Sequence, residues 1–240
     1  YEYGHGVTKN YEKARMYYDL GSKQNNSYAI VNLGNIYLKG LGCPIDYPRA
    51  KYYYEKSSEL NNPIAFYLLG LMYSTGLGVK ENCKKAIEYY EKAAELHNTS
   101  ALIQLALIYI EGHGVTKNYE KANELIESGL VRCKQNPMFY QLFLILKAEI
   151  AANKENNPSK AIEIYNSLIT NEKTHPYCLQ VAATNIAALS IETNIHQAKK
   201  MMSYFDNNDK YADYRQSEVE SYLINRFLIL HKIGQPNKVK

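Results

Sequence analysis

The sequence predicts an all-α protein, built as a solenoid of stacked helix pairs, and three repeating features indicate it. Self-similarity with a fixed period of 36 residues runs through the first half of the chain, as is typical of repeat architectures. Each unit carries a pair of glycines, and an Asn or Asp follows them at a constant distance. Between these markers, the apolar residues are spaced as in helices with one buried face.

The period is easiest to follow at a recurring tyrosine, which is followed three and five residues later by glycine. These tyrosines are Tyr1, Tyr37, Tyr73 and Tyr109. The eleven residues from Gly4 to Ala14 also recur without change from Gly112 to Ala122. Coincidence cannot explain such a match, so residues 1–129 are predicted to form regular repeats, of which the first is truncated.

The unit that begins at Pro63 illustrates the first helix, which is predicted over about residues 63–74. Ala65, Leu69 and Met72 recur at the spacing of one buried face, and proline suits a first helical turn. The glycines that follow are expected to end the helix and reverse the chain, because glycine adopts a positive φ without a Cβ clash. These structural turn residues are Gly40, Gly42, Gly76, Gly78, Gly112 and Gly114.

The second helix of each unit is expected to begin after a side chain that can accept a hydrogen bond from the first turn, which is worth about 1 kcal/mol. The four capping residues are Asn10, Asp46, Asn82 and Asn118. Paired polar residues, Asn61–Asn62 and His97–Asn98, are expected to form the turn before the next unit. One position of the first helix holds only small residues, which would allow close helix approach: Gly34, Gly70 and Ala106.

These motifs resemble the Sel1-like repeat, a relative of the tetratricopeptide repeat. The resemblance is carried by Leu69-Gly70-x-x-Tyr73-x-x-Gly76-x-Gly78-Val79 and then Lys85-Ala86-x-x-Tyr89-Tyr90-x-x-Ala93-Ala94, and it covers about residues 1–129. It implies a right-handed α/α superhelical solenoid. Members of that family usually bind other proteins. They serve as adaptors in membrane-associated degradation complexes, as bacterial secreted or effector proteins, or as regulatory partners of enzymes.

After Gly129 the register is lost, but helix start signals continue. They are Asn136–Pro137, Asn157–Pro158, His175–Pro176 and Asn194. We interpret residues 130–206 as degenerate tetratricopeptide-like helix pairs, and residues 207–240 as a capping helix with a basic tail. Leu144 stands where the regular units have Gly70, so close packing of the earlier kind is not expected here.

The amino-acid composition and the net charge indicate which class of partner the protein can bind. The apolar fraction of 46% is enough for a sizeable core, and 28 basic against 24 acidic side chains leave a net charge of only +4. An RNA-reading solenoid would need cationic contacts and a repeated polar code, but Asn32, Leu68 and Gln104 at one repeated position show none. We therefore expect no nucleic-acid partner.

Membrane insertion is not expected either, since no apolar stretch reaches the length of a membrane-spanning helix. The four cysteines form no Cys-x-x-Cys pair and are expected to be reduced. A disulfide-free chain suits the cytosol or a secreted effector, and the sequence does not decide between them.

The sequence contains no recognisable catalytic motif. His5 and His113 share a loop position, but three units separate them, so they cannot bind one metal ion, and Leu41 and Leu77 occupy the position in between. We expect no catalytic residue, metal or cofactor. A hydrolase acting on cell-wall or β-lactam substrates is a remote alternative, because the similar proteins proposed to do this carry paired cysteines in each unit.

The first helices are apolar nearly all round, and two explanations are possible. Neighbouring first helices could bury this surface between them, or it could form a concave groove for a partner's helix or extended segment. The predicted partner-binding residues are Val31, Asn32, Asn35, Leu38, Tyr67, Leu71, Ile103, Gln104, Leu107 and Ile110. The predicted function is a non-enzymatic scaffold for a protein or peptide. The alternative is a regulatory or inhibitory partner of an enzyme or effector, docked through the C-terminal half.

Overall fold

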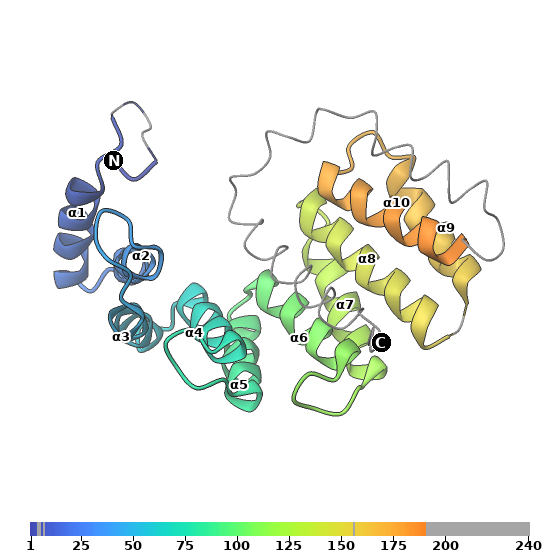
Figure 1. Ribbon diagram of the computed structural model, residues 1–240, viewed down its shortest axis with the longest axis horizontal. Helices are drawn as coiled ribbons and strands as arrows, with labels where there is room; N and C mark the ends of the chain where they lie inside the picture. The colour runs from blue at the N-terminus through green and yellow to red at the C-terminus, as the bar shows by residue number, and fades with distance from the viewer. Residues whose placement is uncertain (4–5, 7, 156, 191–240) are drawn as a thin grey trace, which may run out of the picture.

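The structure, a computed structural model, describes residues 1–3, 6, 8–155 and 157–190, and every regular element in these ranges is an α-helix (Figure 1). The helices are α1 (Tyr11–Lys23), α2 (Ser27–Lys39), α3 (Tyr47–Ser58), α4 (Pro63–Thr75), α5 (Cys83–Glu95), α6 (Thr99–Glu111), α7 (Tyr119–Arg132), α8 (Pro137–Asn153), α9 (Pro158–Ile169) and α10 (Pro176–Ser190). The predicted all-α class is confirmed. The helix expected after Asn194 and the capping helix expected within residues 207–240 lie outside the described residues.

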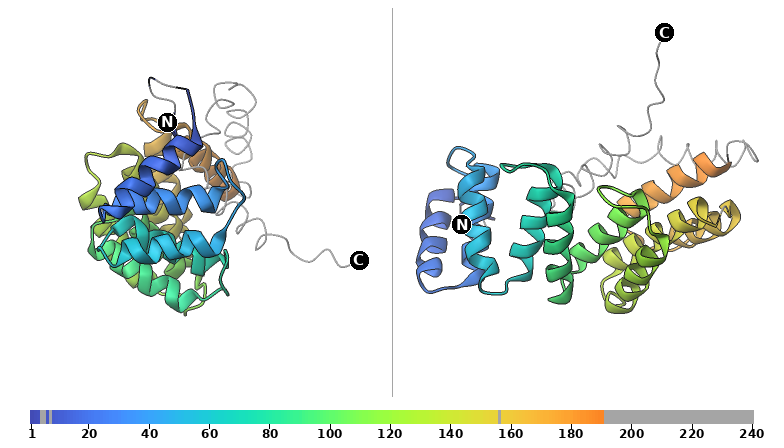
Figure 2. Two further views of the ribbon diagram at one scale, coloured as in Figure 1. Left: turned by 90° about the vertical axis from the view of Figure 1, so that its left-hand side faces the viewer. Right: turned by 90° about the horizontal axis from the view of Figure 1, so that it is seen from below.

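Consecutive helices form pairs, and the pairs are stacked in chain order (Figure 2). Within the pairs, α2 packs on α3, α4 on α5, α6 on α7 and α8 on α9. Between them, α3 packs on α4, α5 on α6 and α7 on α8, while α10 contacts α9 and α8. The result is a solenoid in which each unit is one helix hairpin. None of the helices in the described part of the chain is long and apolar enough to cross a membrane.

Two glycines shape the loop inside each regular unit. Gly40, Gly76 and Gly112 end α2, α4 and α6 with a left-handed backbone, at φ of 67°, 72° and 71°. The second glycine of each loop also has a positive φ, which is 68° at Gly78. Because L-residues with a Cβ adopt this conformation rarely and at a cost, glycine is the residue best suited to these two positions of the loop.

The second helix of each regular unit begins directly after the capping side chain that the sequence predicts. These second helices are α1, α3, α5 and α7. The side chains of Asn10, Asp46 and Asn118 each accept a hydrogen bond from the backbone N–H three residues later, at 2.9 Å. Asn82 does the same for Lys85, at 3.1 Å. The capping satisfies one of the four backbone donors that a helix leaves free at its start.

The polar pairs before the first helices do more than form turns. Asn61 and His97 take a left-handed backbone, with φ of 55° and 64°, and the residue that follows each of them caps the next helix. Asn62, which is 2% exposed, also donates from Nδ2 to Ser27 Oγ at 3.1 Å, which joins two successive units. The asparagine before Pro63 is therefore a helix cap, whereas its place in a polar pair predicts only a turn.

The small residues of the first helices lie directly against large residues of the second helices. A Cβ added at Gly34 would be 2.4 Å from Tyr54 Cε1, and one added at Gly70 would be 2.6 Å from the ring of Tyr90. Both rings are fully buried. The predicted close approach is confirmed at these two positions, and the glycines provide the space that the rings fill.

The close contact continues beyond the regular repeats, but there the glycine lies on a second helix and the large residue on a first helix. A Cβ at Gly129 on α7 would be 2.1 Å from the ring of Phe143, which lies on α8 in the next pair. One hydrophobic core runs from Ala86 to Ile186, so the regular and irregular parts share their interior. Close packing thus survives the change in register, but between two units instead of within one.

Candidate functional site

A groove of about 680 Å³ lies along the first helices α4, α6 and α8, with the end of α2 at one side. Its apolar lining includes Leu38, Ile64, Tyr67, Leu68, Leu71, Ile103, Leu107, Met138, Phe139 and Leu142. Its polar lining includes Asn35, Lys39, Ser74, Gln104, Glu111 and His113. An apolar floor with a polar border is the composition typical of a site that takes an amphipathic ligand.

Helix α4 supplies most of the accessible floor because it is apolar on both sides. Leu69 and Met72 are buried in a cluster with Ala50 and Tyr54 of α3, whereas Tyr67, Leu68 and Leu71 are only half-buried. None of the described helices buries these three side chains as fully as Leu69 and Met72 are buried. These half-buried apolar residues of α4 therefore form the floor of the groove.

Tyr67 and Gln104 connect two first helices across the groove. Their side chains are hydrogen-bonded, and the Tyr67 ring lies 5.9 Å from the ring of Tyr90, centroid to centroid. Burial raises the pKa of Tyr67, and the bond to Gln104 opposes this in part. The phenol is therefore neutral at ordinary pH and can act as a hydrogen-bonding group in an otherwise apolar surface.

Seven of the ten predicted partner-binding residues line the groove together. They are Asn35, Leu38, Tyr67, Leu71, Ile103, Gln104 and Leu107. The other three, Val31, Asn32 and Ile110, are not part of the lining: Val31 and Ile110 are 2% and 4% exposed, and Asn32 is half-buried. These three residues lie on the predicted side of their helices, but the groove does not extend to them.

The two explanations for the apolar first helices each describe part of the structure. Helix α6 packs on α8, and its residues Ile103 and Leu107 are 2% and 7% exposed. On α4 the corresponding face is half-buried and accessible. Packing between first helices thus accounts for α6, and an open apolar surface accounts for α4.

Met138 and Phe139 on α8 also line the groove, although they are not among the residues predicted from the sequence. Both are half-buried and stand in the segment where the 36-residue register is lost. The available signal was composition, since α8 is apolar nearly all round, as α4 and α6 are. The groove therefore extends from the regular repeats into the C-terminal half.

The comparison with protein families matches the Sel1 repeat four times, at residues 1–26, 27–62, 63–98 and 99–129. A search of curated proteins gave no match. Among solved structures, the chain is similar to a Sel1 repeat protein from Oxalobacter formigenes, with a TM-score of 0.66 and 24% identity, covering 85% of this chain and 82% of that one.

A second similar structure is a protective antigen of uropathogenic Escherichia coli strains that displays an SLR fold. The TM-score is 0.58 and the identity 21%, and the match covers 85% of this chain and 50% of that one. At such identities these two likenesses show the fold. Because the repeat matches span 129 of the 240 residues, the chain belongs to the Sel1 repeat family.

Proposed function

We propose that this protein is a binding module that holds a segment of another polypeptide in the groove between α4, α6 and α8. Sel1 repeat proteins are typically scaffolds for protein–protein interaction and are generally not enzymes. The observation that carries the proposal is the half-buried apolar surface of Tyr67, Leu68 and Leu71, which continues to Phe139 on α8. Such a continuous apolar surface is typical of interaction sites.

The form of the groove favours an amphipathic helix or an extended segment with several apolar side chains. A bound helix would place anchors from one face onto the leucines, while its polar residues would meet Asn35, Lys39 and Glu111 at the border. Tyr67 suits a central contact, because a rigid ring with a polar tip loses little conformational entropy on binding. The predicted partner is therefore a protein or peptide.

The contacts of Ser74, a hydroxyl in the groove lining, support a structural role for this residue over a catalytic one. Ser74 Oγ donates to the carbonyl oxygen of Leu71 at 3.0 Å and lies 3.1 Å from the hydroxyl of Tyr90. A nucleophilic serine needs a general base within hydrogen-bond distance, and neither contact provides one. The serine instead holds the buried tyrosine in place.

A display library of random peptides provides a test that needs no known partner. Peptides selected on the wild-type protein would be measured by fluorescence anisotropy against Leu71→Glu, which puts a charge on the groove floor, and against Tyr52→Glu. Tyr52 is 58% exposed on α3 and does not line the groove, so it is the matched control.

We expect binding to be lost in Leu71→Glu and retained in Tyr52→Glu, with both variants folded by circular dichroism. A desolvated charge in an apolar contact costs several kcal/mol, so the loss should exceed about a hundredfold. Peptides that bind Leu71→Glu as tightly as the wild type would contradict the proposal.

A further inference from the structure

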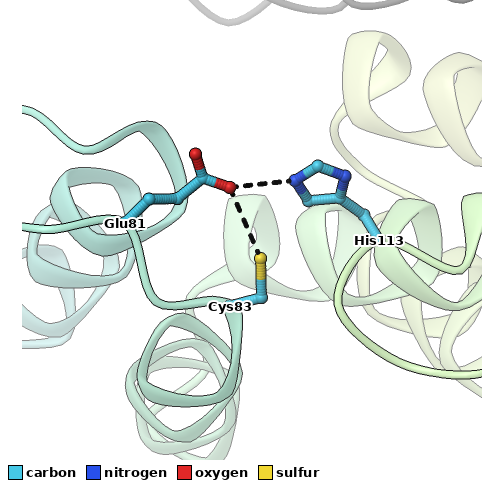
Figure 3. A group of neighbouring side chains, drawn as sticks. All are labelled: Glu81, Cys83 and His113. Atoms are coloured by element: carbon cyan, nitrogen blue, oxygen red, sulfur yellow. Dashed lines mark hydrogen bonds and ion pairs between the residues drawn. The ribbon is translucent and has the colours of Figure 1, made fainter.

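Three side chains with metal-ligating atoms meet at the junction between the units 63–98 and 99–129. Glu81, Cys83 and His113 lie together, with their ligand atoms all within 4.8 Å of one another (Figure 3). One carboxylate oxygen, Glu81 Oε1, is 3.5 Å from His113 Nε2 and 3.8 Å from Cys83 Sγ. The carboxylate thus stands between the other two groups.

The repeat itself shows that this combination is specific to one junction. The positions equivalent to Glu81 hold Lys9, Ile45 and Lys117, and those equivalent to Cys83 hold Tyr11, Tyr47 and Tyr119. The residue corresponding to His113 at the preceding junctions is Leu41 or Leu77. All three positions thus carry a metal-ligating side chain at the same junction, although none needs one to form the repeat.

The backbone fixes the distance between the two loops that carry these residues. Cys83 is the first residue of α5, and Asn82 caps that helix, which holds Glu81 and Cys83 at its start. A Cβ added at Gly114 would be 2.2 Å from Cys83 Cβ, so the loop of the next unit lies directly against the cysteine. His113 is the residue before this contact and is therefore held beside the thiol.

We propose that Glu81, Cys83 and His113 form a binding site for a transition-metal ion, with Zn²⁺ as the preferred ion. In tetrahedral zinc sites the Zn–N and Zn–O bonds are about 2.0–2.1 Å and the Zn–S bond about 2.3 Å, which places neighbouring ligand atoms about 3.3–3.6 Å apart. The separations of 3.5 and 3.8 Å that join Glu81 Oε1 to the other two ligand atoms are close to this range, and the sulfur and the nitrogen lie within 4.8 Å of each other. Thiolate and imidazole donors select zinc over magnesium or calcium.

Metal binding would replace the contacts that the three groups make with each other. In the metal-free protein the thiol donates to Glu81, and burial together with this carboxylate raises the pKa of Cys83. Coordination needs the thiolate, so each bound Zn²⁺ displaces the thiol proton into solution. The carboxylate then exchanges its contacts with sulfur and nitrogen for one bond to the metal.

Such an ion would join two successive units and keep at least one coordination position for a further ligand. The side chains of His113 and Glu81 are 51% and 56% exposed, so water or a donor from another molecule can reach the ion. His113 also lines the groove, which places the metal at the edge of the proposed peptide site. The metal site nevertheless stands on its own residues and does not depend on the groove having a ligand.

The test is Zn²⁺ binding to the reduced, metal-free full chain, measured by competition with a chromogenic chelator. The ligand variants are Cys83→Ser and His113→Leu, the latter introducing the residue found at the two preceding junctions. The matched controls are Cys43→Ser, which removes another half-buried cysteine, and His97→Asn, which introduces the residue that Asn61 provides at the equivalent turn.

We expect one equivalent of Zn²⁺ to bind to the wild type and to both controls, and to bind more than tenfold more weakly to each ligand variant. Loss of an outer-shell partner alone weakens metal binding by about 10–100-fold, and loss of a ligand should not cost less. Co²⁺ should give a thiolate-to-metal charge-transfer band that disappears in Cys83→Ser. No stoichiometric binding, or binding unchanged in Cys83→Ser, would overturn the proposal.

Discussion

The ring of Tyr90 occupies the space that a side chain at Gly70 would need. A Cβ at Gly70 would lie 2.6 Å from both Cδ1 and Cε1 of the ring. The same relationship joins Gly34 and Tyr54 one unit earlier. In the next unit Ala106 replaces the glycine and Ile126 replaces the tyrosine, and both are fully buried. Where the small residue gains a methyl group, the large residue is smaller, so the volume of the pair is balanced.

We predict that Gly70→Ala destabilises the protein, although alanine is the better helix former. The helix propensity gain is about 1 kcal/mol, whereas forcing a methyl group into a filled core typically costs about 1–3 kcal/mol. Tyr90 is fully buried, so its ring would have to give up core contacts to make room for the methyl group. The free energy of unfolding, measured by urea titration, should fall.

The pair found in the next unit supplies the control for this prediction. Tyr90→Ile alone should be destabilising by about 2–4 kcal/mol, because it leaves a cavity and removes the contact with Ser74. The double variant Gly70→Ala/Tyr90→Ile should be more stable than the sum of the two single changes predicts, by about 1 kcal/mol. Strict additivity would show that the ring and the glycine do not share this space.

The two glycines of one loop should differ in their tolerance of alanine. Gly76 and Gly78 both have a positive φ, so each change costs about 1–2 kcal/mol in backbone strain. At Gly76 the nearest atom to a new Cβ is 3.6 Å away, but at Gly78 Tyr47 Cβ is only 2.2 Å away. Thermal unfolding should therefore occur at a lower temperature in Gly78→Ala than in Gly76→Ala, and the reverse order would contradict the close contact.

Two asparagine caps provide a comparison between a local and an inter-unit role. Asn82→Ala should cost about 1 kcal/mol, since the side chain is exposed and caps only α5. Asn62→Ala should cost more, by roughly 1 kcal/mol for a lost buried hydrogen bond, because Asn62 also donates to Ser27 of the preceding unit. Urea unfolding of the two variants measures the difference, and equal losses would argue against the inter-unit bond.

The last described helix should weaken in acid through His175. Its Nδ1 accepts a hydrogen bond from the backbone N–H of Tyr177 at 3.3 Å, and burial lowers its pKa below the ordinary value of 6.5. Above that value both states are neutral and stability does not depend on this group. As the pH falls below it, the unfolded chain takes up the proton first, so the free energy of unfolding decreases.

The variant His175→Asn isolates this effect, because asparagine can accept the same hydrogen bond without titrating. Urea unfolding at pH 7 and pH 5 should show a smaller loss of stability in the variant than in the wild type. Equal losses in both proteins would show that other groups account for the acid sensitivity.

The sequence was sufficient for features that depend on short stretches of chain. The capping role of Asn82 and the close approach at Gly70 each follow from one residue type at a fixed place in the period. The pair Asn136–Pro137 likewise predicts the helix that begins at Pro137, after the 36-residue period ends. Local chemistry at helix ends and tight contacts leaves such signals even in a single sequence.

Other features required the packing between units. Ile110 shares a face of α6 with the groove residues Ile103 and Leu107, but it does not line the groove, and α6 packs on α8 as well as on α7. The proximity of Cys83 and His113 depends on how closely the loops of two units approach, which residue spacing did not give. The period relates His113 only to the distant His5, whereas its neighbours Glu81 and Cys83 stand at different positions of the preceding unit.

The most direct measurement of the proposed function is site-specific photo-crosslinking. A benzophenone amino acid at Leu68, on the groove floor, is compared with the same group at Tyr52 on α3, in the full chain incubated with a selected peptide. We predict a crosslinked product from position 68 that free peptide competes away, and none from position 52. Crosslinking at position 52 but not at position 68 would contradict the claim that the groove holds the partner.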